Sequence, residues 1–195
     1  MGVVLAGGRG RRLGGAKAMV ELCGWPLITY PLAALSAVLD EVAIIAKPDT
    51  RLPSLPAVTV WIEPQEPHHP LVGIVQALGL AEGRPVLVCA GDLPFVSPEL
   101  VAELAIAGPG DAPAVIAAHD GSQQPLLGCY QPAAALPLAE AARRRDPVRA
   151  AVASIGPRLL EVDDPELLFN VNAPEDLLQA AAILDSRRRG MPSRM

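Results

Sequence analysis

Three features are scarce in this sequence, and each scarcity argues against a class of protein. Aromatic residues make up 3% of the chain although half of it is apolar, so the core has to be built from aliphatic side chains. The three cysteines are widely spaced, which argues against a disulfide framework or a cysteine zinc site. No apolar run approaches the roughly 20 residues that a membrane helix needs, and the opening does not resemble a secretory leader. We therefore expect a cytoplasmic protein that does not bind membranes.

Excess positive charge is also lacking. The net charge of −5 argues against a nucleic-acid partner, because such binding depends on neutralising phosphates with basic side chains. The basic charge concentrates in a loop near the N-terminus and in residues 186–195, which we predict to be a disordered tail. The length of 195 residues suits one domain, which we place at residues 1–185.

The most informative stretch is residues 3–17, where an apolar run leads into a loop with five glycines, three arginines and Lys17. Glycines let backbone N–H groups turn inward around an anion, so the loop predicts a phosphate cradle. A P-loop does not fit, because Ala16 separates Gly15 from Lys17. A dinucleotide fingerprint does not fit either, because Leu13 stands at its third glycine. A flexible turn with solvated arginines is the remaining alternative.

Apolar runs of strand length alternate with helical spacing along the chain. This alternation predicts a single-domain, three-layer α/β/α fold around a mainly parallel, Rossmann-like sheet. Residues 2–6, 42–46 and 86–90 should be neighbouring parallel strands. Further strands are predicted at 58–62, 114–118, 124–130, 159–162 and 167–171. Helices are predicted at 27–39, 71–80, 133–144, 147–154 and 175–184, the first with Pro26 in its first turn. A further helix is predicted to begin after Ser97, which caps it.

Asp92 directly follows the uncharged strand predicted at 86–90. Ligands bind such sheets at the carboxyl ends of the strands, so Asp92 and the glycine loop should share one crevice. A carboxylate beside a phosphate cradle favours a Mg²⁺ ligand, because Mg²⁺ prefers one or two carboxylates plus phosphate oxygens. The alternative is that Asp92 caps the following turn.

Two asparagines, Asn170 and Asn172, point the same way on an extended segment by the alternation of a strand. They can offer amide oxygens to a metal or hold an acceptor substrate. Alternatively, Asn172 caps the last helix, because Pro174 and Glu175 follow it. His68 and His69 lack a third ligand at zinc spacing, so we interpret them as exposed loop residues.

The loop resembles the Leu-Ala-Gly-Gly-x-x-x-Arg-Met/Leu-Gly…Lys signature of nucleotidyltransferases, most closely the molybdenum cofactor guanylyltransferases. Gly91-Asp92-Leu93-Pro94 resembles their magnesium aspartate element, and residues 170–175 resemble their Asn-x-Asn-x-Pro-Glu element. The resemblance implies the nucleotide-diphospho-sugar transferase type of fold. It also implies these roles: nucleotide contacts at Leu5, Ala6, Gly7, Gly8, Arg9, Gly10, Lys17 and Asp92; catalysis by Arg12, Lys17 and Asp92; metal binding by Asp92 and Asn172; acceptor binding by Asn170 and Asn172.

The implied reaction is the Mg²⁺-dependent transfer of GMP from GTP to molybdopterin, with release of pyrophosphate. The implied partners are GTP or another nucleoside triphosphate, a phosphorylated pterin-type acceptor and, transiently, molybdoenzyme-assembly proteins. Two alternatives stay open. One is a sister enzyme that uses CTP or another acceptor. The other is a nucleotide-binding module without catalysis, which the joint presence of Lys17 and Asp92 disfavours.

The chain also departs from the family pattern in four places. Ala16-Lys17 stands where Asp-Lys is common, and His69 replaces the first glycine of the Gly-Pro-Leu-Ala-Gly element. Ala46-Lys47 and Glu63-Pro64 occupy the places of an asparagine and an aspartate that help to bind the guanine nucleotide in the family. The sequence therefore leaves the base preference open.

Overall fold

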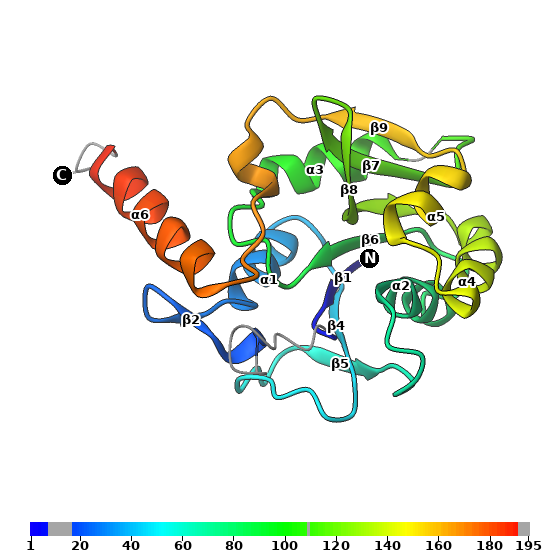
Figure 1. Ribbon diagram of the computed structural model, residues 1–195, viewed down its shortest axis with the longest axis horizontal. Helices are drawn as coiled ribbons and strands as arrows, with labels where there is room; N and C mark the ends of the chain where they lie inside the picture. The colour runs from blue at the N-terminus through cyan, green and yellow to red at the C-terminus, as the bar shows by residue number, and fades with distance from the viewer. Residues whose placement is uncertain (8–16, 109, 191–195) are drawn as a thin grey trace.

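The computed structural model describes residues 1–7, 17–108 and 110–190, and a seven-stranded sheet runs through its centre (Figure 1). The strand order is β5-β4-β1-β6-β8-β7-β9. Strand β1 pairs in parallel with β4 on one side and β6 on the other, which confirms the predicted neighbours. In this sheet β8 runs antiparallel to both β6 and β7. The strands are β1 (Gly2–Leu5), β4 (Val42–Ala46), β5 (Thr59–Ile62), β6 (Val86–Ala90), β7 (Ala114–His119), β8 (Ser122–Tyr130) and β9 (Arg158–Glu161).

Helices cover both faces of the sheet, which confirms the three-layer α/β/α prediction. Successive strand residues point to opposite faces, so Val4 packs in one core cluster and Val3 in the other. On the Val4 face lie α1 (Thr29–Ser36) and α3 (Pro98–Ala107), the latter capped by Ser97 as predicted. The Val3 face carries α2 (Pro70–Leu80), α4 (Ala135–Arg144, preceded by the 3₁₀ turn η3, Pro132–Ala134) and α5 (Val148–Ser154). No helix in the described ranges is long and apolar enough to cross a bilayer.

A third, smaller core cluster joins a hairpin to the C-terminal helix. The hairpin consists of β2 (Glu21–Leu22) and β3 (Trp25–Pro26), and helix α6 (Pro174–Gly190) extends outward beside it (Figure 1). Cys23 and Gly24 both have positive φ, the backbone of a tight two-residue hairpin turn. Pro26 therefore lies in a strand, and the prediction that it opens a helix was wrong. Helix α1 begins at Thr29 and ends at Ser36, short of the predicted residue 39.

The C-terminal region corrects two further predictions. The predicted strand at 167–171 does not form. Its first two residues end a 3₁₀ turn, η4 (Pro165–Leu168), because the Asp164 carboxylate accepts a hydrogen bond from the Glu166 N–H and Pro165 fixes the first turn, and residues 169–171 have no regular secondary structure. The predicted disordered tail is helical as far as Gly190. Arginines in the last turn of a helix are stabilised by its dipole, and Arg187 also reaches Glu166 at 2.9 Å. Residues 191–195 lie outside the described residues.

Strand β8 contains a large irregularity where it pairs with β7. Its register with β7 pairs Ile116 with Gly128 and then Ala118 with Gln123, so residues 124–127 lie opposite a single residue of β7. Pro125 lies in this bulge and has no N–H to donate to a ladder. Its carbonyl instead accepts a hydrogen bond from the buried Tyr130 hydroxyl. Bulges of this kind redirect side chains, often beside active sites.

Candidate active site

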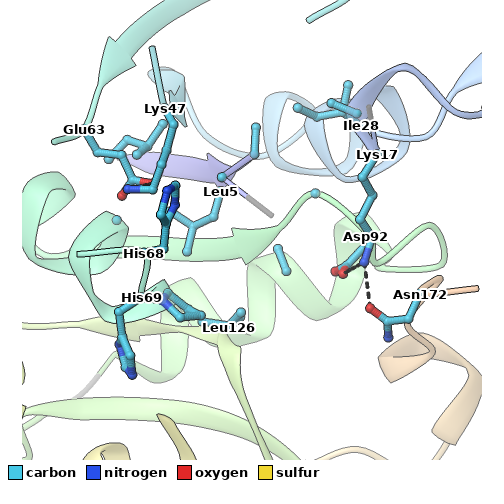
Figure 2. A pocket seen from close by; sticks show the side chains of 18 residues that line it. Leu5, Lys17, Ile28, Lys47, Glu63, His68, His69, Asp92, Leu126 and Asn172 are labelled. Carbon is cyan, nitrogen blue, oxygen red and sulfur yellow. Dashed lines mark hydrogen bonds and ion pairs between the residues drawn. The ribbon is translucent and has the colours of Figure 1, made fainter. Parts of the chain in front are cut away.

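A cavity of about 680 Å³ opens at the carboxyl ends of the parallel strands. The ends of β1, β4, β5 and β6 all contribute to its lining, as expected for a ligand site in a sheet of this type. Polar side chains gather at two opposite ends of it (Figure 2). One end holds Lys17, Asp92 and Asn172, and the other holds Lys47, Glu63 and His68.

The first polar end is built around the Lys17 ammonium. Lys17 begins the 3₁₀ turn η2 (Lys17–Met19), and its Nζ lies 2.5 Å from Asp92 Oδ2 and 2.7 Å from Asn172 Oδ1. Asn170 Nδ2 donates to the other carboxylate oxygen, Asp92 Oδ1, at 3.1 Å. The side chains of Lys17 and Asp92 are only 15% and 18% exposed, so water screens their charges weakly. The fold thus brings together four residues that the sequence singled out.

Backbone contacts hold this arrangement at the strand ends. The Gly91 N–H donates to the Leu5 carbonyl at 3.0 Å, and a Cβ at Gly91 would lie 3.1 Å from that same oxygen. Glycine therefore lets the turn after β6 approach the end of β1. The Val171 N–H donates to the Asp92 carbonyl at 2.9 Å, which brings the segment with both asparagines against the same turn.

The capping interpretations of Asp92 and Asn172 do not match these contacts. The Asp176 carboxylate accepts from the N–H groups of Asn172 and Ala173 at 2.8 and 2.9 Å, so Asp176 satisfies the start of α6. The Asn172 side chain is left to meet Lys17. The Asp92 carboxylate meets the side chains of Lys17 and Asn170.

The second polar end is a buried ion pair that sequence reasoning had read only as a departure from the family pattern. Lys47 and Glu63 are 3% and 5% exposed, and Lys47 Nζ lies 3.2 Å from Glu63 Oε1. Lys47 also donates to the Pro64 carbonyl at 2.6 Å. Among the described residues, Glu63 Oε2 has no hydrogen-bond partner. Burial raises the pKa of Glu63, and the nearby Lys47 charge opposes that rise.

Two glycines make room for the Glu63 carboxylate. A Cβ at Gly7 would lie 2.5 Å from Glu63 Oε1, and a Cβ at Gly73 would lie 3.3 Å from Oε2. Residues larger than glycine at position 7 would displace the carboxylate from the end of β1. An orphaned buried carboxylate oxygen costs free energy, so a ligand that donates to it would be bound favourably. The signal in the sequence was the place of Lys47 and Glu63 directly after two strands.

The first polar end fits a magnesium ion. Two oxygen ligands, one anionic and one an amide carbonyl, already converge on a single cation, the Lys17 ammonium. One carboxylate with a neutral oxygen matches the small number of protein ligands that Mg²⁺ takes beside phosphates. Asp92 and Asn172 are therefore the residues that can hold the metal.

The remaining predicted residues divide into those that line the cavity and those outside the described part of the chain. Leu5, Ala6 and Gly7 line it, as expected. Gly8, Arg9, Gly10 and Arg12 lie outside the described residues, so their predicted roles stay predictions. His69 is not a free loop residue, because its Nδ1 accepts from the Leu71 N–H and caps α2.

Sequence reasoning also missed Gln124, whose Nε2 donates to Asn170 Oδ1 at 2.6 Å. Gln124 had been interpreted only as part of a strand. The signal for its role was the proline that follows it, because proline inside a strand marks an edge or a bulge.

Comparison with known proteins assigns the family. The family model described as MobA-like NTP transferase domain matches residues 2–159. The chain belongs to this family. The MobA-like chain is 35% identical to a molybdenum cofactor guanylyltransferase of Cereibacter sphaeroides, over 94% of this chain and 96% of that protein. A probable molybdenum cofactor guanylyltransferase of Chloroflexus aggregans is 34% identical and covers 94% of each chain. The protein is accordingly a nucleotidyltransferase of the molybdenum cofactor guanylyltransferase type.

Solved structures agree with this family and with the fold. Molybdopterin-guanine dinucleotide biosynthesis protein A from Archaeoglobus fulgidus superposes on this MobA-like transferase with a TM-score of 0.77 at 26% identity, over 95% of this chain and 100% of that one. A 2-C-methyl-D-erythritol 4-phosphate cytidylyltransferase from Thermus thermophilus has a TM-score of 0.68 at 22% identity, over 94% of this chain and 98% of that one. The second likeness concerns the fold alone. Both confirm the predicted type of α/β fold.

Proposed function

We propose that the protein transfers GMP from GTP to the phosphate of molybdopterin with release of pyrophosphate, in a Mg²⁺-dependent reaction. The observation that carries the proposal is the meeting of the Lys17 ammonium with the Asp92 and Asn172 oxygens at the end of β1. A partly buried ammonium group can stabilise phosphate charge, and the carboxylate beside it can bind a metal ion that contacts the same phosphates. The names of the relatives support GTP as the donor and molybdopterin as the acceptor.

The reaction is an in-line displacement at the α-phosphorus. An oxygen of the acceptor's phosphate forms a bond to the α-phosphorus, and the bond from that phosphorus to the bridging oxygen of the β-phosphate breaks. Pyrophosphate leaves with the electron pair. The attacking phosphate is already ionised at neutral pH, so the site needs no general base. The protein has to position the two substrates and stabilise the negative charge that shifts to the leaving group.

The residues at the first polar end divide this work. Lys17 stabilises the phosphate charge, and Asp92 with Asn172 would hold the metal. A bound Mg²⁺ supplies further positive charge to the phosphate oxygens. Asn172 is exposed and is proposed to face the acceptor as well, whereas the Asn170 amide is engaged between Asp92 and Gln124.

The second polar end supports a guanine base. The Watson–Crick edge of guanine offers two adjacent donors, the ring N1–H and the exocyclic amine, and a carboxylate accepts from both. Glu63 supplies a buried carboxylate whose Oε2 lacks a partner among the described residues. The matching edge of cytosine has an amine beside an acceptor nitrogen, which a carboxylate repels. This favours GTP over the CTP alternative.

The direct test mixes the purified protein with molybdopterin, Mg²⁺ and either GTP or CTP, and measures pyrophosphate release together with the nucleotide-linked pterin. We expect both products with GTP, a much slower reaction with CTP, and none after Mg²⁺ is chelated. Tight GTP binding without pyrophosphate release would support the non-catalytic alternative. Faster turnover with CTP would overturn the assigned base preference.

A further inference from the structure

The bulge in β8 sends one polar side chain toward the proposed catalytic carboxylate. Residues 124–127 lie opposite a single residue of β7, and the Tyr130 hydroxyl holds the Pro125 carbonyl inside this bulge. Gln124, the first residue of the bulge, reaches Asn170 Oδ1 with its Nε2 at 2.6 Å. Asn170 in turn donates its Nδ2 to Asp92 Oδ1 at 3.1 Å. Two amides in series therefore connect the bulge to Asp92.

The direction of these hydrogen bonds is fixed by the charge at one end. An ionised carboxylate only accepts, so Asn170 must turn its NH₂ toward Asp92. Its oxygen then faces Gln124, which must donate. Each amide can satisfy the next in only one orientation, and the pair together has one low-energy arrangement. Such a series orders a carboxylate whose own terminal torsion is soft and nearly two-fold.

We propose that Gln124 is a positioning residue, which orients Asn170 and through it the Asp92 carboxylate. With Oδ1 held by Asn170, Asp92 presents Oδ2 to Lys17, as the 2.5 Å contact between them requires. The inference rests on the proposed transfer reaction, because that reaction gives Asp92 its task. Gln124 itself touches neither substrate in this scheme.

Two substitutions of nearly equal size separate positioning from packing. Gln124→Leu removes the donor and leaves Asn170 without its partner. Gln124→Glu keeps the shape but places a carboxylate against Asn170 Oδ1, so the Asn170 amide flips and turns its oxygen on Asp92. Misplacing a catalytic group by about 1 Å costs on the order of 10²-fold in rate. We expect kcat to fall about 10-fold in Gln124→Leu and about 100-fold in Gln124→Glu, with the KM for GTP changed by less than about 3-fold.

The matched control is Gln131→Glu, which makes the same chemical change just beyond the other end of β8. Within the described ranges the Gln131 side chain makes one long hydrogen bond, 3.4 Å to the Gly110 carbonyl and away from the site, so the kcat of Gln131→Glu should stay unchanged. If Gln124→Glu, which keeps the shape of the side chain but loses the donor, turns over as fast as the unsubstituted protein, Gln124 acts by filling space and the proposal is wrong.

A double substitution tests whether Gln124 acts through Asn170. If it does, Gln124→Leu combined with Asn170→Ala loses no more activity than Asn170→Ala alone, because the intermediary is already gone. Fully additive losses in the double variant would show a separate action of Gln124 and overturn the relay.

A measurement on the free protein keeps this inference separate from the proposed function. The side-chain amide protons of Asn170 should resist exchange with water in the unsubstituted protein, and should exchange faster in Gln124→Leu but not in Gln131→Glu. Absence of pyrophosphate release by the unsubstituted protein would defeat the transfer reaction, while the exchange rates would still decide the relay. Equal exchange in the unsubstituted protein and in Gln124→Leu would overturn it.

Discussion

Lys17 is the residue that joins the other members of the first polar end of the cavity. Its ammonium contacts Asp92 and Asn172 at once, although these lie 75 and 155 positions away in the chain. Both contacts come from side chains on irregular backbone that the sheet brings together, and neither contributes to the main hydrophobic core. Substitutions here should therefore alter chemistry far more than folding.

Lys17→Ala should lower kcat by about 10²–10³, the usual cost of removing one preorganised electrostatic group. The melting temperature should change little, because Lys17 and Asp92 lie outside the hydrophobic core clusters and Asp92 keeps its hydrogen bond from Asn170 in the variant. Pyrophosphate release and thermal unfolding measure the two effects. Arg51→Ala, which removes an exposed cation elsewhere, is the control. Unchanged turnover in Lys17→Ala would remove Lys17 from the mechanism.

Asp92→Asn tests the carboxylate without changing its size. The backbone bond from Val171 to the carbonyl of residue 92 is kept, so stability should hold. Mg²⁺ loses its anionic ligand, so turnover should collapse, with partial recovery at high Mg²⁺ concentration. Steady-state rates over a Mg²⁺ series, together with urea unfolding, decide this. Near-normal turnover at low Mg²⁺ would contradict the metal role.

Glu63 can be tested through the ligand alone, which avoids breaking its buried pair with Lys47. Inosine triphosphate differs from GTP only by lacking the exocyclic amine. A hydrogen bond to a charged group contributes about 1.5–3 kcal/mol, so inosine triphosphate should bind at least about 10-fold more weakly than GTP. Calorimetric titration of both nucleotides measures the difference. Equal affinities would mean that Glu63 does not contact the exocyclic amine.

The same nucleotide pair reports the ionisation of Glu63. Burial raises the pKa of Glu63 above its ordinary value of 4.5. The carboxylate accepts from both guanine donors only when ionised, so the advantage of GTP over inosine triphosphate should shrink as the pH falls through the raised pKa. Affinities measured downward from neutral pH give this profile. The triphosphate is common to both nucleotides and cancels from the ratio. A ratio that stays constant down to pH 4.5 would contradict the carboxylate contact.

At the scale of elements, the bulge of β8 places Gln124 beside Asn170 and Leu126 in the lining of the cavity. An uninterrupted ladder between β7 and β8 would alternate residues strictly between the two faces, and Gln124 would follow that alternation. The four-residue bulge breaks the alternation, and Leu126 from the same bulge also lines the cavity. The Tyr130–Pro125 contact connects the bulge to the core.

Tyr130→Phe should weaken that element. The substitution keeps the ring in a fully buried position but leaves the Pro125 carbonyl without its donor. An unsatisfied buried acceptor costs about 1–3 kcal/mol, and urea unfolding should show a loss of that size. Turnover should fall as well, because Gln124 is part of the bulge and its side chain would shift when the bulge is disturbed. Tyr30→Phe, which removes a hydroxyl bonded to the Leu22 carbonyl in the hairpin, should cost stability without the same loss of turnover. Unchanged stability of Tyr130→Phe would mean that the bulge does not depend on this bond.

Local patterns predicted most elements, and the errors have local causes. The strands at 42–46 and 86–90 agree with their predicted bounds, because buried parallel strands are short uncharged apolar runs. The run at 167–171 has the same appearance, but Asp164 and Pro165 begin a 3₁₀ turn just before it. The run of arginines after residue 186 was interpreted as a solvated tail, whereas the helix dipole and Arg187 contacts with Glu166 and Phe95 extend α6.

At the scale of the whole molecule, the parallel sheet brings distant segments to one edge. The register pairs Leu5 with Ala90 and Leu5 with Ile45, so the chain leaves three adjacent strands at the same level. The first polar end of the cavity then forms next to β1 and β6, and the buried pair Lys47 and Glu63 forms next to β4 and β5 (Figure 2). The width of the sheet thus separates the proposed phosphate and base subsites.

The sequence by itself determined the strand and helix periodicities, the glycine loop with Lys17, the strand-end place of Asp92 and the paired asparagines. These signals are local, because periodicity and turn chemistry act over a few residues. Only the tertiary structure decided that Lys17 meets Asp92, that Asp176 rather than Asn172 caps α6, and that Glu63 is buried with an oxygen that has no hydrogen-bond partner in the described part of the chain. It also decided the role of Gln124. The Lys17–Asp92 contact joins side chains 75 positions apart, and the Gln124–Asn170 contact joins side chains 46 positions apart where a strand slips in register, and no local pattern records either.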